Sequence, residues 1–336
     1  AMPAEGWPVA ILQHGITSKK EDMLAITGAL SLQGIATVAI NHPLHGDPAL
    51  GGSRGFDLDS TTPGDEINAT TVSATHYMNL ASLLTTRDNL RQSIVDTLGL
   101  RLGLNPLPGF IDGSKVTYLG HSLGAITGTG FTAMANSPLD PQIDPLFTVN
   151  ASSLAMPGAG VANFLLESPS FSGLIKASLT LELSEDFAAL VAATYPDGPT
   201  EAELVGIYTQ FYAALTTEQQ AELDGGFAEF TFAAQTVTDA GDPANYAAIL
   251  AATQTPIHLI EVVGDGMDNL SDQVIPNRVS TTPIGGTEGL IALLGLENAG
   301  DNLTDLPIGG IGVIGSTAVR FTEGSHSSVL SPAASA

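Results

Sequence analysis

The chain has 336 residues and a formal net charge of −25, from 35 acidic and 10 basic side chains. This acidic balance excludes binding of nucleic acid or of an anionic membrane through a basic patch. Cysteine is absent, which excludes a disulfide framework, a thiolate metal site and a cysteine nucleophile. No apolar run approaches the length of a membrane span, and the chain is long enough for one large α/β domain with an insertion or for two ordinary domains.

The first predicted strand covers residues 8–13, a continuous apolar run that ends at His14-Gly15-Ile16. A helix with Ser18 and Glu21 at capping-box spacing should follow and end at Gly34, before a second strand over residues 35–41. Continuous apolar strands are typical of a parallel sheet that is covered on both faces. The order strand, helix, strand therefore predicts a right-handed parallel crossover.

Residues 47–75 are rich in Gly, Asp, Ser, Thr and Pro, which predicts a long polar loop near the carboxyl ends of the strands. Four of its carboxylates could offer calcium the oxygen ligands that it prefers: Asp57, Asp59, Asp65 and Glu66. Their spacing fits no standard calcium loop. We expect a solvated acidic loop without a cofactor, and a structural calcium ion is the alternative.

The central motif of the chain lies at residues 115–124, where a β-branched and aromatic run leads directly into Gly120-His121-Ser122-Leu123-Gly124. An amphipathic helix over residues 85–104 precedes it, and small residues suited to a second helix follow. In G-x-S-x-G the serine occupies a sharp, strained turn from strand to helix, and glycines allow the two elements to approach closely. A second match at residues 51–55 has no strand before it. Ser122 is therefore the candidate nucleophile.

A further strand is predicted over residues 146–155, after which the segments from about 158 to 255 read as helices. Ser184 should open one helix, and Thr200 with Glu203 and Thr217 with Gln220 have capping-box spacing. We expect residues 158–255 to form a helical cap that is inserted into a core of residues 1–157 and 256–336. A helical subdomain packed away from the site is the alternative.

A serine hydroxyl needs an adjacent base, and that base needs an acid to orient it. Nucleophile elbows are followed along the chain by the acid and then by histidine. Only His326 follows the last predicted strand, residues 317–321, in a Gly- and Ser-rich loop, so it is the candidate base. The candidate acids follow the strand over residues 257–263, in the order of preference Asp272, Asp268 and Asp265.

Asp272 is preferred because Asp272-Gln273-Val274-Ile275-Pro276 resembles the Asp-x-x-Val-Pro turn of many α/β-hydrolases. Aspartates that are not the acid are expected to be turn formers or helix caps. Two N–H groups must also face the oxyanion of the tetrahedral intermediate. One should come from Leu123, the residue after the nucleophile, and the other from Ile16, in the turn after the first strand.

The sequence thus resembles the α/β-hydrolase superfamily over nearly its whole length. Within it, several stretches resemble the large secreted or surface-anchored lipases and lysophospholipases of marine gammaproteobacteria: residues 87–92, 120–126, 242–243 and 271–276. The resemblance implies a mainly parallel sheet flanked by helices and a Ser122, His326 and aspartate triad. It also implies a secreted or cell-surface bacterial location and an N-terminal region that this sequence lacks.

The expected function is that of a serine carboxylester hydrolase, a lipase that cleaves fatty-acyl esters and needs no metal or other cofactor. Its partners would be small-molecule or lipid esters, with contact to a lipid interface through the cap and none with nucleic acid. A lysophospholipase or a polyester-active esterase would use the same triad. A non-catalytic binding module on this fold would normally lack one triad member.

Overall fold

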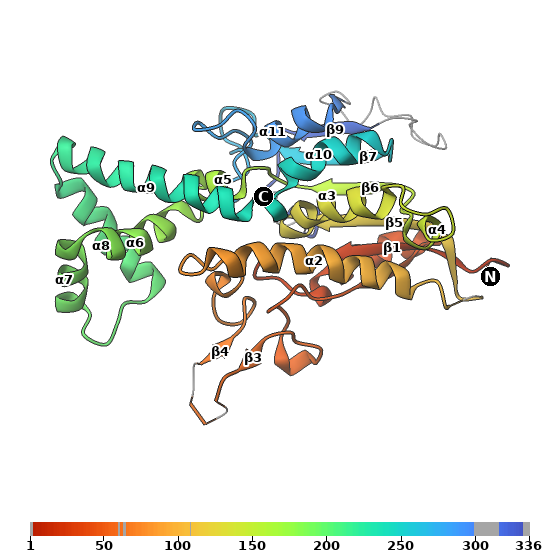
Figure 1. Cartoon of the computed structure of the whole chain (residues 1–336), viewed down its shortest axis with the longest axis horizontal. Helices are drawn as coiled ribbons and strands as arrows, with labels where there is room; N and C mark the ends of the chain where they lie inside the picture. Colours follow the sequence, from red (N-terminus) through yellow and green to blue (C-terminus); the bar gives the residue numbers. More distant parts are fainter. Residues whose placement is uncertain (1–2, 60, 63–64, 108, 299–315, 332–336) are drawn as a thin grey trace.

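The computed structural model describes residues 3–59, 61–62, 65–107, 109–298 and 316–331. Its centre is a seven-stranded sheet of order β2-β1-β5-β6-β7-β9-β8, and every pair of neighbouring strands is parallel (Figure 1). The strands are β1 Trp7–Gln13, β2 Ala36–Ala39, β5 Ile111–His121, β6 Ser152–Ala155, β7 Ile257–Val262, β8 Glu297–Asn298 and β9 Thr317–Phe321. The predicted parallel sheet is confirmed.

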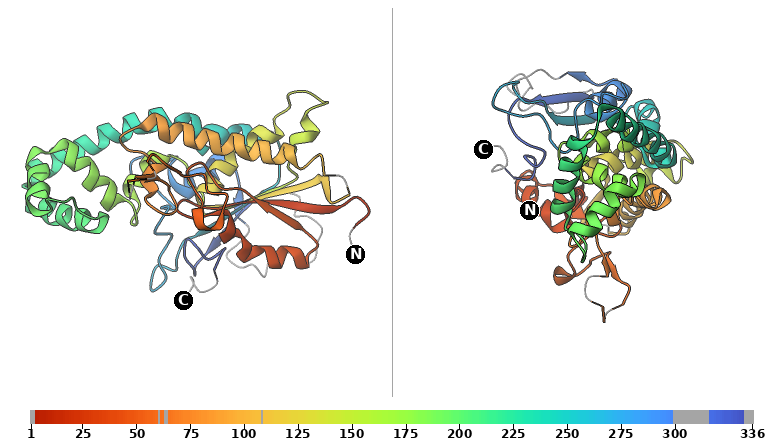
Figure 2. Two further views of the ribbon diagram at one scale, coloured as in Figure 1. Left: turned by 90° about the horizontal axis from the view of Figure 1, so that it is seen from below. Right: turned by 90° about the vertical axis from the view of Figure 1, so that its left-hand side faces the viewer.

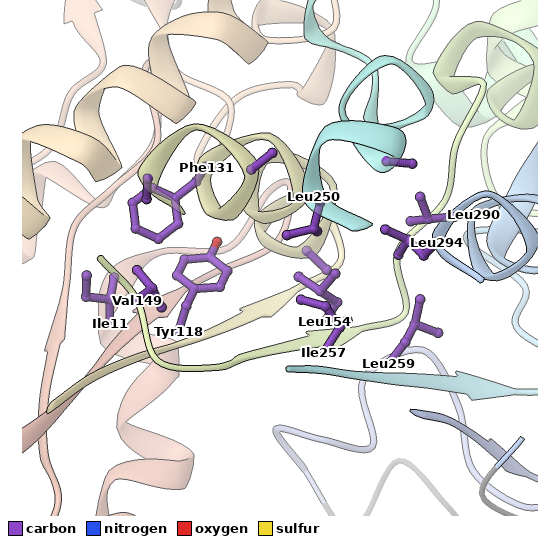
Figure 3. Packing of buried hydrophobic residues seen from close by; sticks show 14 of the residues in the cluster. Ile11, Tyr118, Phe131, Val149, Leu154, Leu250, Ile257, Leu259, Leu290 and Leu294 are labelled. Atoms are coloured by element: carbon purple, nitrogen blue, oxygen red, sulfur yellow. The ribbon is translucent and has the colours of Figure 1, made fainter. Parts of the chain in front are cut away.

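Helices cover both faces of this sheet (Figure 2). The layer on one face contains α2 (Leu83–Gly103), α3 (Leu123–Asn136), α10 (Pro243–Ala252) and α11 (Gly286–Leu294), whereas α1 (Leu24–Leu32) lies on the other face. The main core lies between α3, α10, α11 and the sheet, where Tyr118, Leu154 and Leu259 meet Phe131 and Leu250 (Figure 3). Burial of each such side chain contributes about 1.5–3 kcal/mol of transfer free energy. The strand order and the turn from β5 into α3 are those of the predicted α/β-hydrolase fold.

The predicted start of one strand and the first predicted capping box are wrong. The strand expected from residue 146 begins only at Ser152, because α4 (Asp144–Phe147) occupies its start and the Asn136 side chain bonds both N–H and C=O of Val149. The capping box expected at Ser18 and Glu21 is absent. Instead the Asp22 carboxylate accepts from the Lys19 N–H and starts a short 3₁₀ helix, η1 (Lys20–Met23).

The long polar loop contains a small antiparallel sheet, β3 (Phe56–Asp57) with β4 (Glu66–Ile67), which projects from the body of the molecule in Figure 1. Its Asp59 carboxylate accepts hydrogen bonds from Thr61 and Thr62 and is exposed. In the described part of the chain, no group of three or more His, Asp or Glu side chains is arranged to hold a metal ion. The solvated acidic loop without a cofactor stays a prediction, with a structural calcium ion as its alternative.

Six helices lie between β6 and β7: α5 (Val161–Glu167), α6 (Ser172–Leu183), α7 (Glu185–Thr194), α8 (Glu201–Ala214), α9 (Thr217–Thr238) and α10. Ser184 caps α7 and Thr200 with Glu203 forms a capping box as predicted, whereas the last box is at Thr216 and Gln219, one residue early. We call α6–α9 the cap helices. They share a separate apolar cluster and extend beyond the edge of the sheet (Figure 1), while α10 packs on α3. Among the described helices, none is long and apolar enough to cross a bilayer.

One buried carboxylate joins the two ends of this insertion. Asp242 caps α10 through the Ala244 N–H at 2.9 Å, and it accepts from the N–H groups of Gly160 and Val161 at 3.0 and 2.6 Å, where α5 begins. The Gln235 side chain donates to it as well, at 3.0 Å. Because the carboxylate is fully buried, removal of the side chain would leave the N–H groups of Gly160, Val161 and Ala244 without this acceptor.

We therefore expect Asp242→Ala to lower the free energy of unfolding by about 3 kcal/mol, since buried donors are left unpaired. Urea unfolding followed by circular dichroism measures this change. Asp239→Ala is the matched control, because the Asp239 carboxylate is exposed and binds only the Gln235 side chain. Equal losses in the two variants would contradict the role of Asp242.

A second buried carboxylate lies between β7 and β9. Glu261 is 1% exposed, and its carboxylate lies 2.8 Å from Arg320 Nε. Arg320 donates two hydrogen bonds to Glu288 of α11. Burial, followed by the charge of Glu288, raises the pKa of Glu261 from 4.5 to about 8 against the opposing effect of Arg320. The folded chain thus retains a proton on Glu261 that the unfolded chain has released above pH 4.5.

This difference predicts that stability falls as the pH rises from 4.5 to about 8, because ionisation favours the unfolded chain over that range. Glu261→Gln removes the titration. The melting temperature of the variant relative to the parent should therefore rise between about pH 5 and pH 9. The exposed Glu229→Gln is the control. A difference from the parent that stays constant with pH would show that Glu261 is ionised in the folded protein.

Candidate active site

The turn between β5 and α3 holds Ser122 in a backbone conformation that side chains rarely adopt, with φ 54° and ψ −119°. Its N–H donates to the Ala155 carbonyl at 2.9 Å, which fixes the turn to the end of β6. The side chain is 4% exposed, at the carboxyl ends of the parallel strands. Strain of this kind persists only where the surrounding contacts impose it.

Three glycines make this turn possible. A Cβ on Gly120 would overlap the backbone of Gly124, and a Cβ on Gly124 would overlap the backbone of Gln13 and His14. At Gly15, a Cβ would lie 2.9 Å from Ser122 Cβ and 3.4 Å from its Oγ. The backbone after β1 therefore lies directly against the serine side chain, as expected for a segment that contributes to the same site.

His326 follows β9, and its Nδ1 lies 2.7 Å from Asp272 Oδ2. Because a carboxylate only accepts hydrogen bonds, Nδ1 carries a proton, and in the neutral form of the ring Nε2 is the nitrogen with the lone pair. Nε2 is buried and has no hydrogen-bond partner among the described residues. The ring is thus held in one tautomer, with its basic nitrogen on the side away from Asp272.

Asp272 is 3% exposed, and its N–H and both carboxylate oxygens are hydrogen-bonded. Its N–H donates to the Val262 carbonyl at 3.0 Å, and its Oδ1 accepts from the N–H groups of Val274 and Ile275 at 2.8 and 3.0 Å. These bonds leave Oδ2 for His326. The loop after β7 therefore delivers one oriented oxygen to the imidazole.

The two other candidate acids lie elsewhere in the same loop. Asp265 is exposed and accepts from the N–H groups of Met267 and Asn269, which lowers its pKa and makes it a turn former. Asp268 is exposed and makes no contact with His326. Among the three aspartates, the structure brings only Asp272 to the imidazole.

His121 is a site residue that the sequence did not single out. Its Nε2 lies 2.6 Å from the His326 carbonyl oxygen, so Nε2 donates, and the two rings lie 5.0 Å apart. Burial lowers the pKa of His121 to about 4, which keeps the ring neutral. The residue before Ser122 is thereby bonded to the loop that carries His326. This bond fixes the loop of His326 to the end of β5.

The predicted oxyanion donors flank Ser122. Leu123 begins α3, where N–H groups have no partner within the helix and the helix dipole favours negative charge. Ile16 lies in the turn after β1. Neither N–H group has an acceptor among the described residues. Both residues line the cavity that contains Ser122.

This cavity has a volume of about 560 Å³. It is lined mainly by apolar side chains from α5, α6, α8 and the loop over residues 69–80, among them Met78, Leu80, Phe164, Phe171, Leu174 and Val205. Glu201 is the only charged residue among the described lining residues, and it accepts from Ser73 Oγ at 2.9 Å. The arrangement offers a mainly apolar chamber whose lining includes Ser122.

No protein-family model matches the chain, and no curated protein matches it significantly. Solved structures with similar folds include the enol-lactonase from Burkholderia xenovorans LB400, at 13% identity over 96% of this chain and 86% of that chain, with a TM-score of 0.42. A lipase in its open form aligns at 16% identity over 95% and 82% of the two chains, with a TM-score of 0.42. The thioesterase domain from the curacin biosynthetic pathway aligns at 14% identity over 99% and 90%, with a TM-score of 0.41. Likenesses at this level carry no information on substrate or mechanism, which have to come from the geometry of this chain.

Proposed function

We propose that the chain is a serine carboxylester hydrolase in which Ser122, His326 and Asp272 form the triad. The observation that carries the proposal is the bond from His326 Nδ1 to Asp272, in a loop that is bonded to His121, the residue before a serine held on a strained turn. A neutral histidine with one proton fixed on Nδ1 has the tautomer that a general base requires. A binding module would have no need for this arrangement.

In the proposed reaction, Ser122 Oγ attacks the ester carbonyl carbon and its proton passes to His326 Nε2. The oxyanion that forms accepts hydrogen bonds from the Ile16 and Leu123 N–H groups. The tetrahedral intermediate expels the alcohol, which takes the proton from His326. Water then attacks the acyl-enzyme by the same route and releases the carboxylic acid. Asp272 stabilises the imidazolium in each half and stays ionised.

The proposed substrates are fatty-acyl esters, because the chamber beside Ser122 is apolar. Large apolar side chains are exposed on the cap helices, including Leu183, Leu190 and Phe232 at 50%, 41% and 77%, which suits contact with a lipid interface. A lysophospholipase or a polyester-active esterase would use the same residues. The resemblance to secreted and surface lipases adds a secreted or cell-surface location to the proposal.

One prediction of the proposed function concerns the triad. Ser122→Ala should abolish both hydrolysis of p-nitrophenyl esters and labelling by a fluorophosphonate, and Asp272→Asn should lower kcat by about 10³- to 10⁴-fold because it favours the wrong tautomer. Asp268→Asn is the matched control in the same loop and should keep the parent rate. If Ser122→Ala retained the parent rate, the nucleophile would have to be sought elsewhere.

Another prediction of the proposed function concerns the chamber. The parent should hydrolyse p-nitrophenyl octanoate and palmitate with higher kcat/KM than the acetate. Ala202→Trp, on the chamber wall in α8, should reduce kcat/KM for the long esters by about tenfold or more and leave the acetate unaffected.

Ala192→Trp is the control, because Ala192 is also an exposed cap-helix alanine but does not line the chamber. Turnover of the acetate alone by the parent would exclude a fatty-acyl ester hydrolase and favour an esterase for small substrates.

A further inference from the structure

A group of buried histidines beside the site has no part in the proposed triad. His14, His42 and His45 are each at most 2% exposed, and their ring centroids lie 4.7 to 5.8 Å apart. His14 directly follows β1, at the start of the segment that leads to Ile16, and the other two follow β2. Three imidazoles excluded from water need bonding partners, and those partners define what the rings do.

The backbone partners fix the tautomers of two of these rings. The His42 N–H donates to His14 Nε2 at 3.1 Å, so Nε2 is unprotonated and His14 Nδ1 carries the hydrogen. His42 Nε2 lies 3.0 Å from the His14 carbonyl and therefore donates to it. His14 is thus bonded to His42 through both its ring and its backbone, and its ring has one direction left in which to donate.

The remaining donor, His14 Nδ1–H, points to the carbonyl of the next residue. His14 Nδ1 lies 2.7 Å from the Gly15 oxygen, which also accepts from the Ser18 N–H at 3.3 Å. The Gly15 carbonyl and the Ile16 N–H belong to one planar trans peptide group, so they point in opposite directions. Holding the oxygen toward His14 and Ser18 turns the Ile16 N–H away from them.

Ser122 lies next to this peptide group. Gly15 lies in contact distance of the serine side chain, and Ile16 lines the same cavity as Ser122 and Leu123. Glycine at position 15 offers no side chain to restrict rotation of this peptide, so an external bond has to fix it. Thr17 follows at φ 61°, in the left-handed region, which is a further sign that the turn is held by its surroundings.

We propose that His14 is a positioning residue, whose Nδ1–H bond to the Gly15 carbonyl aims the Ile16 N–H at the oxyanion. The proposal rests on the proposed ester hydrolysis and adds to it a residue that never touches substrate. His42 holds the His14 ring in the tautomer that makes this bond.

Burial supports the bonding pattern. Loss of hydration, followed by the neighbouring His45, lowers the pKa of His14 to about 3, and burial lowers the pKa of His42 well below its ordinary value. A neutral His14 can accept from the His42 N–H on one nitrogen and donate to Gly15 from the other, whereas an imidazolium could not accept. The hydrogen bonds of the His14 ring to the Gly15 carbonyl and the His42 N–H are therefore expected throughout the neutral pH range.

Two substitutions separate the two bonds of the His14 ring. The side-chain nitrogen of Asn occupies the position of His Nδ1, so His14→Asn can still donate to Gly15. The terminal amide of Gln reaches the position of His Nε2, so His14→Gln can accept from the His42 N–H but leaves the Gly15 carbonyl without its ring donor. We expect His14→Gln to lower kcat for p-nitrophenyl octanoate roughly tenfold to a hundredfold with little change in KM. His14→Asn should recover most of the loss.

The affinity for a transition-state analogue is a measurement that a merely structural role of His14 would leave unchanged. The affinity of His14→Gln for an alkyl boronic acid should fall by the same factor as kcat/KM, because both report the oxyanion contacts. Melting temperatures of both variants establish the folded fraction. His258→Gln, which replaces a half-buried histidine of β7 bonded to Ser153, is the matched control and should keep the parent kcat.

The outcomes separate this inference from the proposed function. A parent chain that neither hydrolyses esters nor reacts with a fluorophosphonate overturns both. An active parent with a folded His14→Gln variant of unchanged kcat overturns the positioning role alone. Equal losses in His14→Gln and His14→Asn, without recovery by Asn, also overturn it, because the effect would then come from the lost ring and not from the bond to Gly15.

Discussion

The site is built on the close approach of three backbone segments at the carboxyl ends of β1 and β5. Ser122 can occupy its strained conformation because Gly120 and Gly124 let α3 start directly against the end of β1. The same approach brings Gly15 against the serine side chain. A larger residue at any of these glycines would push apart elements that the buried core holds together. The strain is therefore balanced by core packing, and the position of the Ser122 hydroxyl in the cavity lining and of the adjacent N–H groups follows from it.

The fold could be predicted because its signals are local. Continuous apolar strands, the G-x-S-x-G turn and the capping residues each specify a short element, and elements that alternate in this way have few arrangements. The missed start of β6 shows the limit of such signals. Val149 and Asn150 have the composition of a strand, but the Asn136 side chain, at the end of α3, takes the backbone bonds of Val149. Competition of that kind is visible only once the helix and the segment are next to each other.

The site could be predicted in part for a related reason. Ser122, His326, Ile16 and Leu123 stand at positions that chain order defines, whereas three aspartates share one polar loop and their sequence spacing does not separate them. What separates them is the hydrogen bond between Asp272 and the His326 ring, which exists only once the two loops are folded next to each other. The roles of the His14 and His121 rings are more difficult still to predict, because the sequence shows neither the tautomer of a histidine nor its hydrogen-bond partner. Both roles depend on carbonyl groups whose directions are set by tertiary structure.

The segment between α5 and α6 is also bonded to the loop that carries Asp272, the acid of the proposed triad. Ser168, between α5 and α6, donates to the Val274 carbonyl at 2.6 Å, and the Ser170 N–H donates to the Gln273 carbonyl at 3.0 Å. Both acceptors lie within two residues of Asp272. The Glu167 carboxylate accepts from the N–H groups of Ser280 and Thr281 beyond the same loop. A displacement of the cap helices large enough to open the chamber would therefore have to break these bonds or bend the chain beyond Ser170. Bending there would leave the loop of Asp272 bonded to the segment around α5, so the bonds at Glu167, Ser168 and Ser170 hold this loop independently of α6–α9.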